Sequence, residues 1–279
     1  MPPVLVMTST FSGFFQAIML PSRTTSDLLG GMWSLLQVAG AVPPRLTWDN
    51  ETGIGKGKLT ERTAAFAGTL GTEIKLLKAR DPESKGMVER RNRFFRSSFM
   101  PGRHFASPQD FNEQITDWLP LANGRHSRSR RARPIDLIEQ DRAAMRPLSP
   151  VAPDVLFRNT VRLPRDYYVR VLSNDYSVAP AMIGRLVDVT ASLDTVNVTH
   201  NGVNVTSHER EWARALTVTD PEHVVQADVL RRQFQTLRHH RPQATVAFVE
   251  TDSLGLARTL QLPQGCATAQ PPRQCGRRK

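Results

Sequence analysis

Leu46-Thr47-Trp48-Asp49-Asn50 ends an apolar run, Val42 to Trp48, on a carboxylate. The run predicts a buried strand, with Asp49 at its end. A second carboxylate, Glu89, lies just inside a predicted helix that follows a strand and a polar turn. Acidic side chains from a strand end and a helix can together hold a divalent metal, because Mg²⁺ prefers hard oxygen ligands. The two contexts therefore indicate metal-dependent phosphoryl transfer.

The composition agrees with a polyanionic substrate. The 279 residues carry a formal net charge of +11 and a sequence pI near 10.5, which points to DNA. No apolar stretch approaches the roughly 20 residues that a membrane span needs. The two cysteines, Cys266 and Cys275, lie in a polar tail and suggest neither a disulfide framework nor a zinc site. These features favour a nuclease or a transposase in a reducing compartment.

Strands and helices alternate in the first part of the chain. Strands are expected at residues 2–7, 14–20, 42–48 and 74–77, and helices at residues 25–39, 60–70, 88–99 and 108–121. Residues 53–58 are predicted to be a loop, and they lack the Gly-Lys-Ser/Thr ending of a phosphate-binding loop. This order is that of an α/β core.

The pattern changes after residue 124. A basic linker punctuated by prolines is expected at 125–153, and then short β-branched runs crowd residues 154–215. Asn201-Gly202 between two Val-Asn-Val-Thr segments predicts a tight hairpin. We therefore expect a small β-barrel at 154–215 and a disordered basic tail at 237–279. The segment 216–236 between them is expected to hold a helix over residues 221–235, because Asp220-Pro221-Glu222 supplies a cap candidate, a proline at the first position and an acid in the first turn.

Three segments carry a resemblance to a known family. They are Pro3–Met7 with Leu20–Thr25, then Trp48–Glu51, then Ala79-Arg80-Asp81-Pro82-Glu83-Ser84-Lys85-Gly86-Met87-Val88-Glu89-Arg90. In these segments the chain resembles the IstA-type insertion-sequence transposases of the retroviral-integrase superfamily. The resemblance implies an RNase H-like integrase core at residues 1–124, with its first strand missing, followed by the small barrel and the helix.

The same resemblance implies the site. Such enzymes use Asp, Asp and Glu, and Asp49 matches the second while Glu89 matches the third. Both would ligate Mg²⁺ or Mn²⁺ for DNA cleavage and strand transfer. The first Asp has no match, because no acidic residue precedes Asp27, and we expect an N-terminally truncated polypeptide. The chain would then be a poor catalyst or an inactive one, so its status as an enzyme stays open.

Basic side chains near these carboxylates are candidates for DNA contact. They are Lys85, Arg90, Arg93 and Arg96 around the Glu89 helix, and Arg125, Arg128, Arg130, Arg131 and Arg133 in the linker. A run of guanidinium groups repels itself unless a polyanion neutralises it, and backbone contact with DNA depends strongly on salt.

Simpler interpretations exist for each residue. Asp49 can be a turn residue at a strand end, Glu89 an ordinary first-turn acid paired with Arg93, and Asn50 either a ligand-orienting group or a turn cap. Glu51 is expected at the loop surface. Asp27 fits an early position in a capped helix and is no obvious replacement for the absent Asp.

The leading hypothesis is a DNA transposase. The alternative is a non-catalytic remnant that binds DNA or an intact transposase, and a third is that no folded product accumulates. Family resemblance implies double-stranded DNA at element ends and target, a homo-oligomer, an ATPase helper and no membrane. It also implies a bacterial cytoplasmic location at the nucleoid.

Overall fold

The computed structural model describes residues 2–77, 93–239, 249–251 and 257–259. The chain divides into two units, Met1–Asp228 and Val229–Lys279. The first unit holds an α/β core and a β-domain, and the second begins within the last long helix. No helix within the described ranges is long and apolar enough to cross a membrane.

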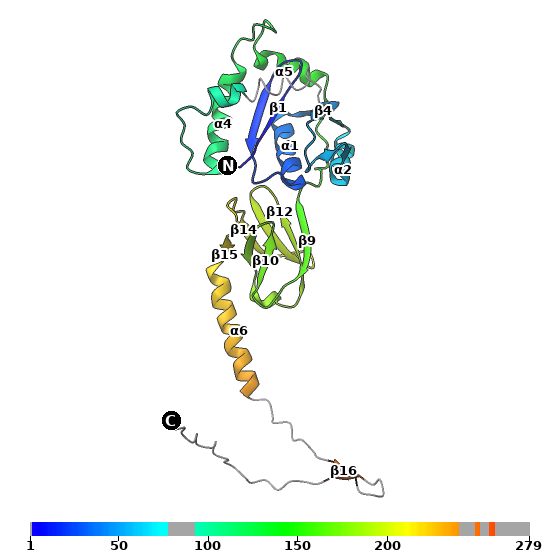
Figure 1. Cartoon of the computed structure of the whole chain (residues 1–279), viewed down its shortest axis with the longest axis vertical. Coiled ribbons are helices and arrows are strands. Elements are labelled where there is room, and N and C mark those ends of the chain that lie inside the picture. Colours follow the sequence, from blue (N-terminus) through cyan, green and yellow to red (C-terminus); the bar gives the residue numbers. More distant parts are fainter. Residues whose placement is uncertain (1, 78–92, 240–248, 252–256, 260–279) are drawn as a thin grey trace, which may run out of the picture. The chain divides into compact units, whose positions relative to one another are not determined.

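Two of the separate strand pairs of the core bear on the predicted site (Figure 1). Strands β1 (Val4–Thr8) and β2 (Phe15–Met19) form an antiparallel hairpin, with Val4 opposite Met19 and Thr8 opposite Phe15. Strands β4 (Arg45–Trp48) and β7 (Glu73–Leu76) pair in parallel. The described helices of this region are α1 (Thr25–Ala39), α2 (Glu61–Leu70), α4 (Pro108–Asn123) and α5 (Pro134–Ala143).

Helix α1 has the bounds that the sequence predicts. The Thr24 hydroxyl accepts a hydrogen bond from the Asp27 backbone N–H at its start, and Gly40 ends it in the left-handed conformation, with φ 74°. Glycine adopts that conformation at no steric cost, which is why it ends so many helices. Leu29, Met32 and Leu36 are fully buried on the inner face of this helix.

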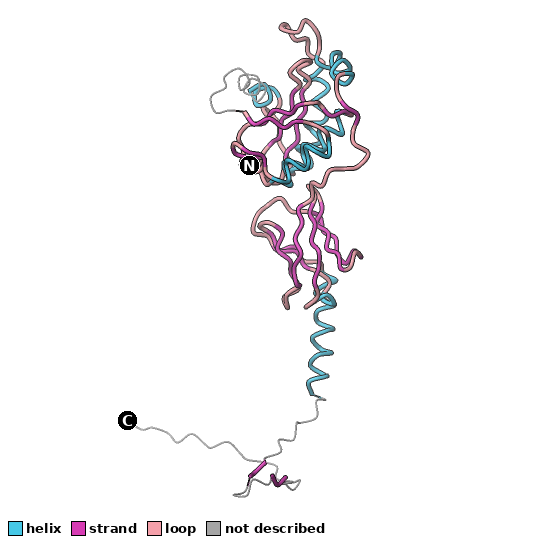
Figure 2. The backbone as a smooth tube through the Cα atoms, turned by 90° about the vertical axis from the view of Figure 1, so that its right-hand side faces the viewer, coloured by secondary structure: helices cyan, strands magenta, loops and turns pink. Residues whose placement is uncertain are grey.

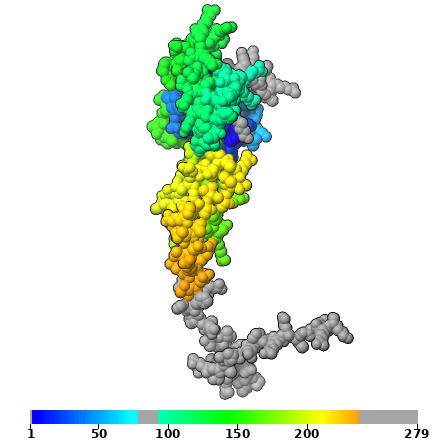
Figure 3. Space-filling model, turned by 90° about the vertical axis from the view of Figure 1, so that its left-hand side faces the viewer, coloured from blue at the N-terminus to red at the C-terminus, as the bar shows by residue number. Residues whose placement is uncertain are grey.

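The β1–β2 hairpin is packed on both faces. Leu5 and Met7 contact the cluster that contains α1, whereas Val4 and Val6 contact the aromatic cluster of α4. Side chains alternate between the faces of a strand, so a continuously apolar strand such as β1 needs cover on both. In the view of Figure 3, blue-green atoms of the α4 region lie over the middle of the core, and blue atoms of the N-terminal residues are visible beside them.

Two expectations about connecting segments were wrong. Residues 53–58 do not remain an open loop, because β5 (Gly55–Lys56) and β6 (Lys58–Leu59) form a small hairpin there, with Gly57 at φ 72°. The predicted linker 125–153 contains α5, and its strand β8 (Arg146–Pro147) pairs with β3 (Ala41–Val42). Ile138 of α5 is buried, so much of this segment is part of the core.

The β-domain consists of two sheets on a common apolar core (Figure 2). One has the order β14-β13-β12-β9 and the other the order β10-β11-β15. The strands are β9 (Phe157–Arg162), β10 (Tyr168–Val171), β11 (Asn174–Ser177), β12 (Leu186–Ala191), β13 (Thr195–His200), β14 (Val203–Glu209) and β15 (Thr217–Val218).

Local turn chemistry explains one connection well. Asn201 and Gly202 both have positive φ, 50° and 78°, between β13 and β14. This geometry is what a two-residue hairpin requires, and it confirms the prediction from the Asn-Gly pair. A short 3₁₀ helix, η1 (Pro180–Met182), precedes β12.

The C-terminal helix starts at Pro221, as the sequence predicts, and continues a few residues beyond its predicted end. Strand β15 lies at the beginning of the 216–236 segment, and α6 runs from Pro221 to His239. Strands β16 (Val249–Thr251) and β17 (Ala257–Thr259) pair with each other in the second unit. Most of the predicted tail 237–279 lies outside the described residues.

Candidate functional site

Asp49 lies at the carboxyl end of β4. Its side chain is exposed, and its Oδ1 accepts a hydrogen bond from the Asn50 backbone N–H at 2.8 Å. β4 and β7 run parallel, so their carboxyl ends lie at one edge, and ligands of open α/β sheets bind outside that edge. Asp49 is therefore available for a ligand at the edge where such a site is expected.

Asn50 has a structural role that the sequence left undecided. Its Nδ2 donates to the Leu77 carbonyl at 2.7 Å, and its Oδ1 accepts from the Gly57 N–H at 3.0 Å. The Leu77 N–H in turn donates to the Trp48 carbonyl at 2.7 Å. Asn50 thus ties the ends of β4 and β7 to the β5–β6 hairpin and fixes the backbone beside Asp49.

Glu51 is more engaged than a simple surface residue. Its carboxylate accepts a hydrogen bond from Trp48 Nε1 at 3.2 Å and lies 3.8 Å from Arg23 Nε. Arg23 follows β2 and precedes α1. This contact places the Asp49 loop next to the Met19 end of β2.

The structure describes only some of the residues around Glu89 that the sequence predicts to bind metal or DNA. Glu89, Lys85 and Arg90 lie outside the described residues. Arg93 and Arg96 are exposed in a described helical segment, whereas Phe95 and Phe99 beside them are buried. No group of three His, Cys, Asp or Glu side chains that could hold a metal occurs within the part of the chain that the structure describes, and His104 and His126 join no such group.

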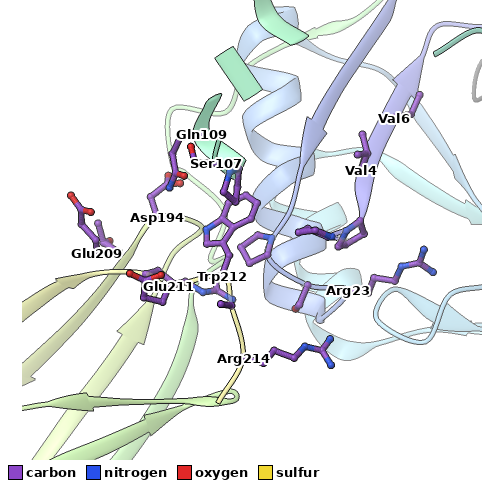
Figure 4. Close-up of a pocket in the computed structure, with 18 of the residues that line it drawn as sticks. Val4, Val6, Arg23, Ser107, Gln109, Asp194, Glu209, Glu211, Trp212 and Arg214 are labelled. Carbon is purple, nitrogen blue, oxygen red and sulfur yellow. The ribbon is translucent and has the colours of Figure 1, made fainter. Parts of the chain in front are cut away.

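A large cavity lies beside the start of β1. It has a volume of 1860 Å³, and Val4, Val6 and Arg96 are among the residues that line it. Figure 4 shows Asp194, Glu209 and Glu211 on one side, Arg23 and Arg214 on the other, and Trp212 between them. The sequence did not predict that acidic and basic side chains line one cavity. Residues of the β-domain line it together with Arg96, which the sequence predicts to contact DNA.

Asp27 is buried in an ion pair with the β-domain. Its carboxylate accepts two hydrogen bonds from Arg210, at 2.7 and 2.9 Å, and a third from Ser22 Oγ at 2.5 Å. The Asp27 and Arg210 side chains are 2% and 4% exposed. Asp27 is therefore occupied in holding the β-domain on α1, which agrees with excluding it as a replacement for the absent catalytic Asp. No local sequence signal links two residues so far apart in the chain.

The basic residues of 125–133 do not form a uniform patch. Arg130 donates to the carbonyls of Phe11 and Thr10, and Arg133 pairs with Asp136. The Arg125 guanidinium lies 5.7 Å from the centre of the Phe94 ring. Arg128 and Arg131 are exposed. The five arginines that the sequence grouped together thus have different surroundings.

Comparisons with known sequences match this chain to transposases. Residues 148–220 match the model of the Mu transposase C-terminal domain. The chain is 27% identical over 216 residues to a putative transposase of Sinorhizobium fredii, covering 74% of this chain and 42% of that protein. It is 29% identical over 147 residues to the transposase of insertion sequence element IS21 of Pseudomonas aeruginosa, covering 52% and 38%.

Further matches have lower identity. A putative transposase for IS1162 of Pseudomonas fluorescens is 25% identical, with 81% of this chain and 42% of that protein covered. The catalytic core domain of BIV integrase matches with 18% identity and a TM-score of 0.40, covering 49% of this chain and 85% of that one. The chain spans about two fifths of the length of the curated relatives that it matches.

Proposed function

We propose that this chain, as an insertion-sequence transposase, binds DNA and carries part of a metal-dependent site for DNA cleavage and strand transfer. The observation that carries the proposal is Asp49, an exposed carboxylate at the shared carboxyl edge of β4 and β7, on a backbone that Asn50 fixes. Residues 78–92, which contain Glu89, follow directly after β7 and Leu77.

The donor chemistry fits a divalent metal only in part. Asp49 supplies a hard oxygen ligand, and Glu89 is the second ligand that we propose. Bound Mg²⁺ or Mn²⁺ would activate the attacking hydroxyl group and stabilise the leaving oxygen. Exposed Arg93 and Arg96 would neutralise substrate phosphates, with Lys85 and Arg90 as further proposed contacts.

We also propose that the two strand pairs are flanks of one incomplete sheet. Leu5 and Met7 of β1 and Leu46 and Trp48 of β4 pack in the same cluster around α1, yet β1 pairs with β2 and β4 with β7. Thr8 Oγ1 and Gln16 Nε2 in the β1–β2 hairpin are buried without a hydrogen-bond partner among the described residues. A further strand between β1 and β4 would join the pairs, and it could carry the third carboxylate.

These 279 residues alone are therefore expected to catalyse poorly. In the same proposal the two-sheet β-domain is the small barrel that follows the core of integrase relatives, and the match at residues 148–220 supports this. The partners would be double-stranded DNA, a second copy of the chain and an ATPase helper, in the bacterial cytoplasm. The alternative is a non-catalytic remnant that binds DNA or intact transposase.

Replacing each of the two proposed metal-binding carboxylates by the corresponding amide tests the metal site. Asp49→Asn and Glu89→Gln should abolish Mn²⁺-dependent nicking of supercoiled plasmid, and broadening of protein resonances by Mn²⁺, while DNA affinity in fluorescence anisotropy persists. Glu51→Gln serves as the control in the same loop and should retain both metal effects. Wild-type protein that binds DNA but responds to Mn²⁺ no differently from these two variants would favour the non-catalytic remnant. Wild-type protein without salt-dependent DNA binding would refute the proposed function.

A further inference from the structure

A small basic hairpin follows α4. Ser127 and Ala132 close it, with a hydrogen bond from the Ser127 N–H to the Ala132 carbonyl at 2.9 Å. Arg131 has φ 52°, a left-handed conformation that a side chain disfavours. We call residues 127–132 the basic hairpin. In Figure 1 it belongs to the green loop at the top of the core.

Neighbouring arginines fix the basic hairpin to the core. Arg130 Nε donates to the Phe11 carbonyl at 2.7 Å, and its Nη2 donates to the Thr10 carbonyl at 3.0 Å. Both acceptors belong to the turn between β1 and β2. Arg133 forms two hydrogen bonds with Asp136, which raise the pKa of the Arg133 side chain. Arg125 lies over the Phe94 ring. These three guanidinium groups are used within the protein.

The remaining two guanidinium groups are presented to solvent. Arg128 and Arg131 are exposed, and neither side chain makes a hydrogen bond or ion pair within the described part of the chain. The closed hairpin and its anchor Arg130 fix the backbone that carries both residues. A backbone that is already fixed avoids the cost of ordering the loop when an anion binds to both side chains.

The basic hairpin lies at the end of the core opposite to Asp49. Asn123, at the end of α4, bonds Phe15 at the start of β2, and Arg130 bonds the turn that precedes it. The Asp49 loop instead lies near Arg23, beyond Met19 at the other end of β2. Five residues of strand separate the two ends by about 13 Å at ~3.3 Å per residue, before the side chains and loops are added.

We propose that the basic hairpin is a second DNA-backbone site, which holds a duplex segment other than the one at Asp49. The inference rests on the proposed function and deepens it. Arg128 and Arg131 bind phosphates, whereas Arg125, Arg130 and Arg133 position the hairpin. Phosphate contacts of this kind carry no sequence preference and fix only the placement of the duplex.

The double variant R128A/R131A tests whether these two arginines bind DNA phosphates. Its plot of log K against log salt should be less steep by about 1.8, because each lost phosphate contact removes about 0.9 from the slope. The control R45A/R170A removes the same charge from two arginines that already pair with Glu73 and Asp175, and its slope should match the wild type. An unchanged slope for R128A/R131A would overturn the proposal.

A capture assay tests whether the basic hairpin binds a DNA duplex other than the one that binds near Asp49. Protein on a bead-tethered duplex should capture a second, labelled duplex, and R128A/R131A should lose this capture at protein concentrations that saturate the first duplex. R93A/R96A should weaken binding of the first duplex instead. Equal loss of both signals in R128A/R131A would place the hairpin within a single DNA site and overturn the inference. Failure of the proposed function is distinguishable, because the wild type would then bind neither duplex.

Discussion

Substitution of Arg210 by Met tests the energetic weight of the buried ion pair between the core and the β-domain. The change keeps most of the side-chain length but leaves the Asp27 carboxylate buried at 2% exposure, with Ser22 Oγ still in contact. Removing one partner of a buried pair costs about 3–5 kcal/mol, because the other charge remains out of water. With a urea m value of roughly 2 kcal/mol per M, the midpoint should fall by about 2 M.

The chain offers a matched control on its surface. Arg45 and Glu73 also pair at 2.7 Å, but their side chains are 59% and 57% exposed. Exposed pairs contribute about 0–1 kcal/mol, so Arg45→Met should barely move the urea midpoint. The double variant Asp27→Leu with Arg210→Met should lose less stability than Arg210→Met alone, since no charge is left buried.

The assay is urea unfolding followed by tryptophan fluorescence, with limited proteolysis between residues 148 and 156 as a second measure. In Arg210→Met the segment that joins the core to the β-domain should be cut faster than in the wild type. The reasoning would be refuted if Arg210→Met and Arg45→Met lowered the midpoint equally. It would also fail if the apolar double variant were the least stable of the three.

Three further outcomes are expected. Burial lowers the pKa of His223 below its usual 6.5. The stability that neutral His223 contributes should therefore be complete above pH 6.5 and decline as the pH falls toward the lowered pKa. Between pH 7 and pH 5, the urea midpoint of the wild type should drop more than that of His223→Gln. Asn50→Ala should cost about 1–3 kcal/mol in urea unfolding, because the Leu77 carbonyl and the Gly57 N–H each lose a hydrogen bond to the Asn50 side chain, and an unchanged midpoint would contradict its clamping role. In α1, Gly30→Ala should raise the melting temperature, because alanine favours the helix more than glycine does. Gly31→Ala should lower the melting temperature, because the added Cβ would lie 2.5 Å from a methyl group of buried Leu20. Shifts of the same sign in the two variants would contradict the packing.

Features with a local cause could be predicted from the sequence. Helix α1 has its predicted bounds because Thr24 and Gly40 provide start and stop signals within a few residues of the helix itself. The turn at Asn201 and Gly202 follows from the conformational freedom of those two residues. The placement of Asp49 directly after β4 follows from the apolar run that precedes it.

The partners of several polar side chains depend on contacts between residues far apart in the sequence. Asp27 gives a local signal for the first turn of a helix, but its partner Arg210 is 183 residues away in the sequence, and only the docking of the β-domain brings the two together. The arginines of residues 125–133 are alike in sequence, yet Arg130 bonds the β1–β2 turn and Arg128 remains exposed. Sequence periodicity reports which face of an element is apolar, whereas the partner of a polar side chain depends on which distant backbone or side chain the fold brings within about 3 Å.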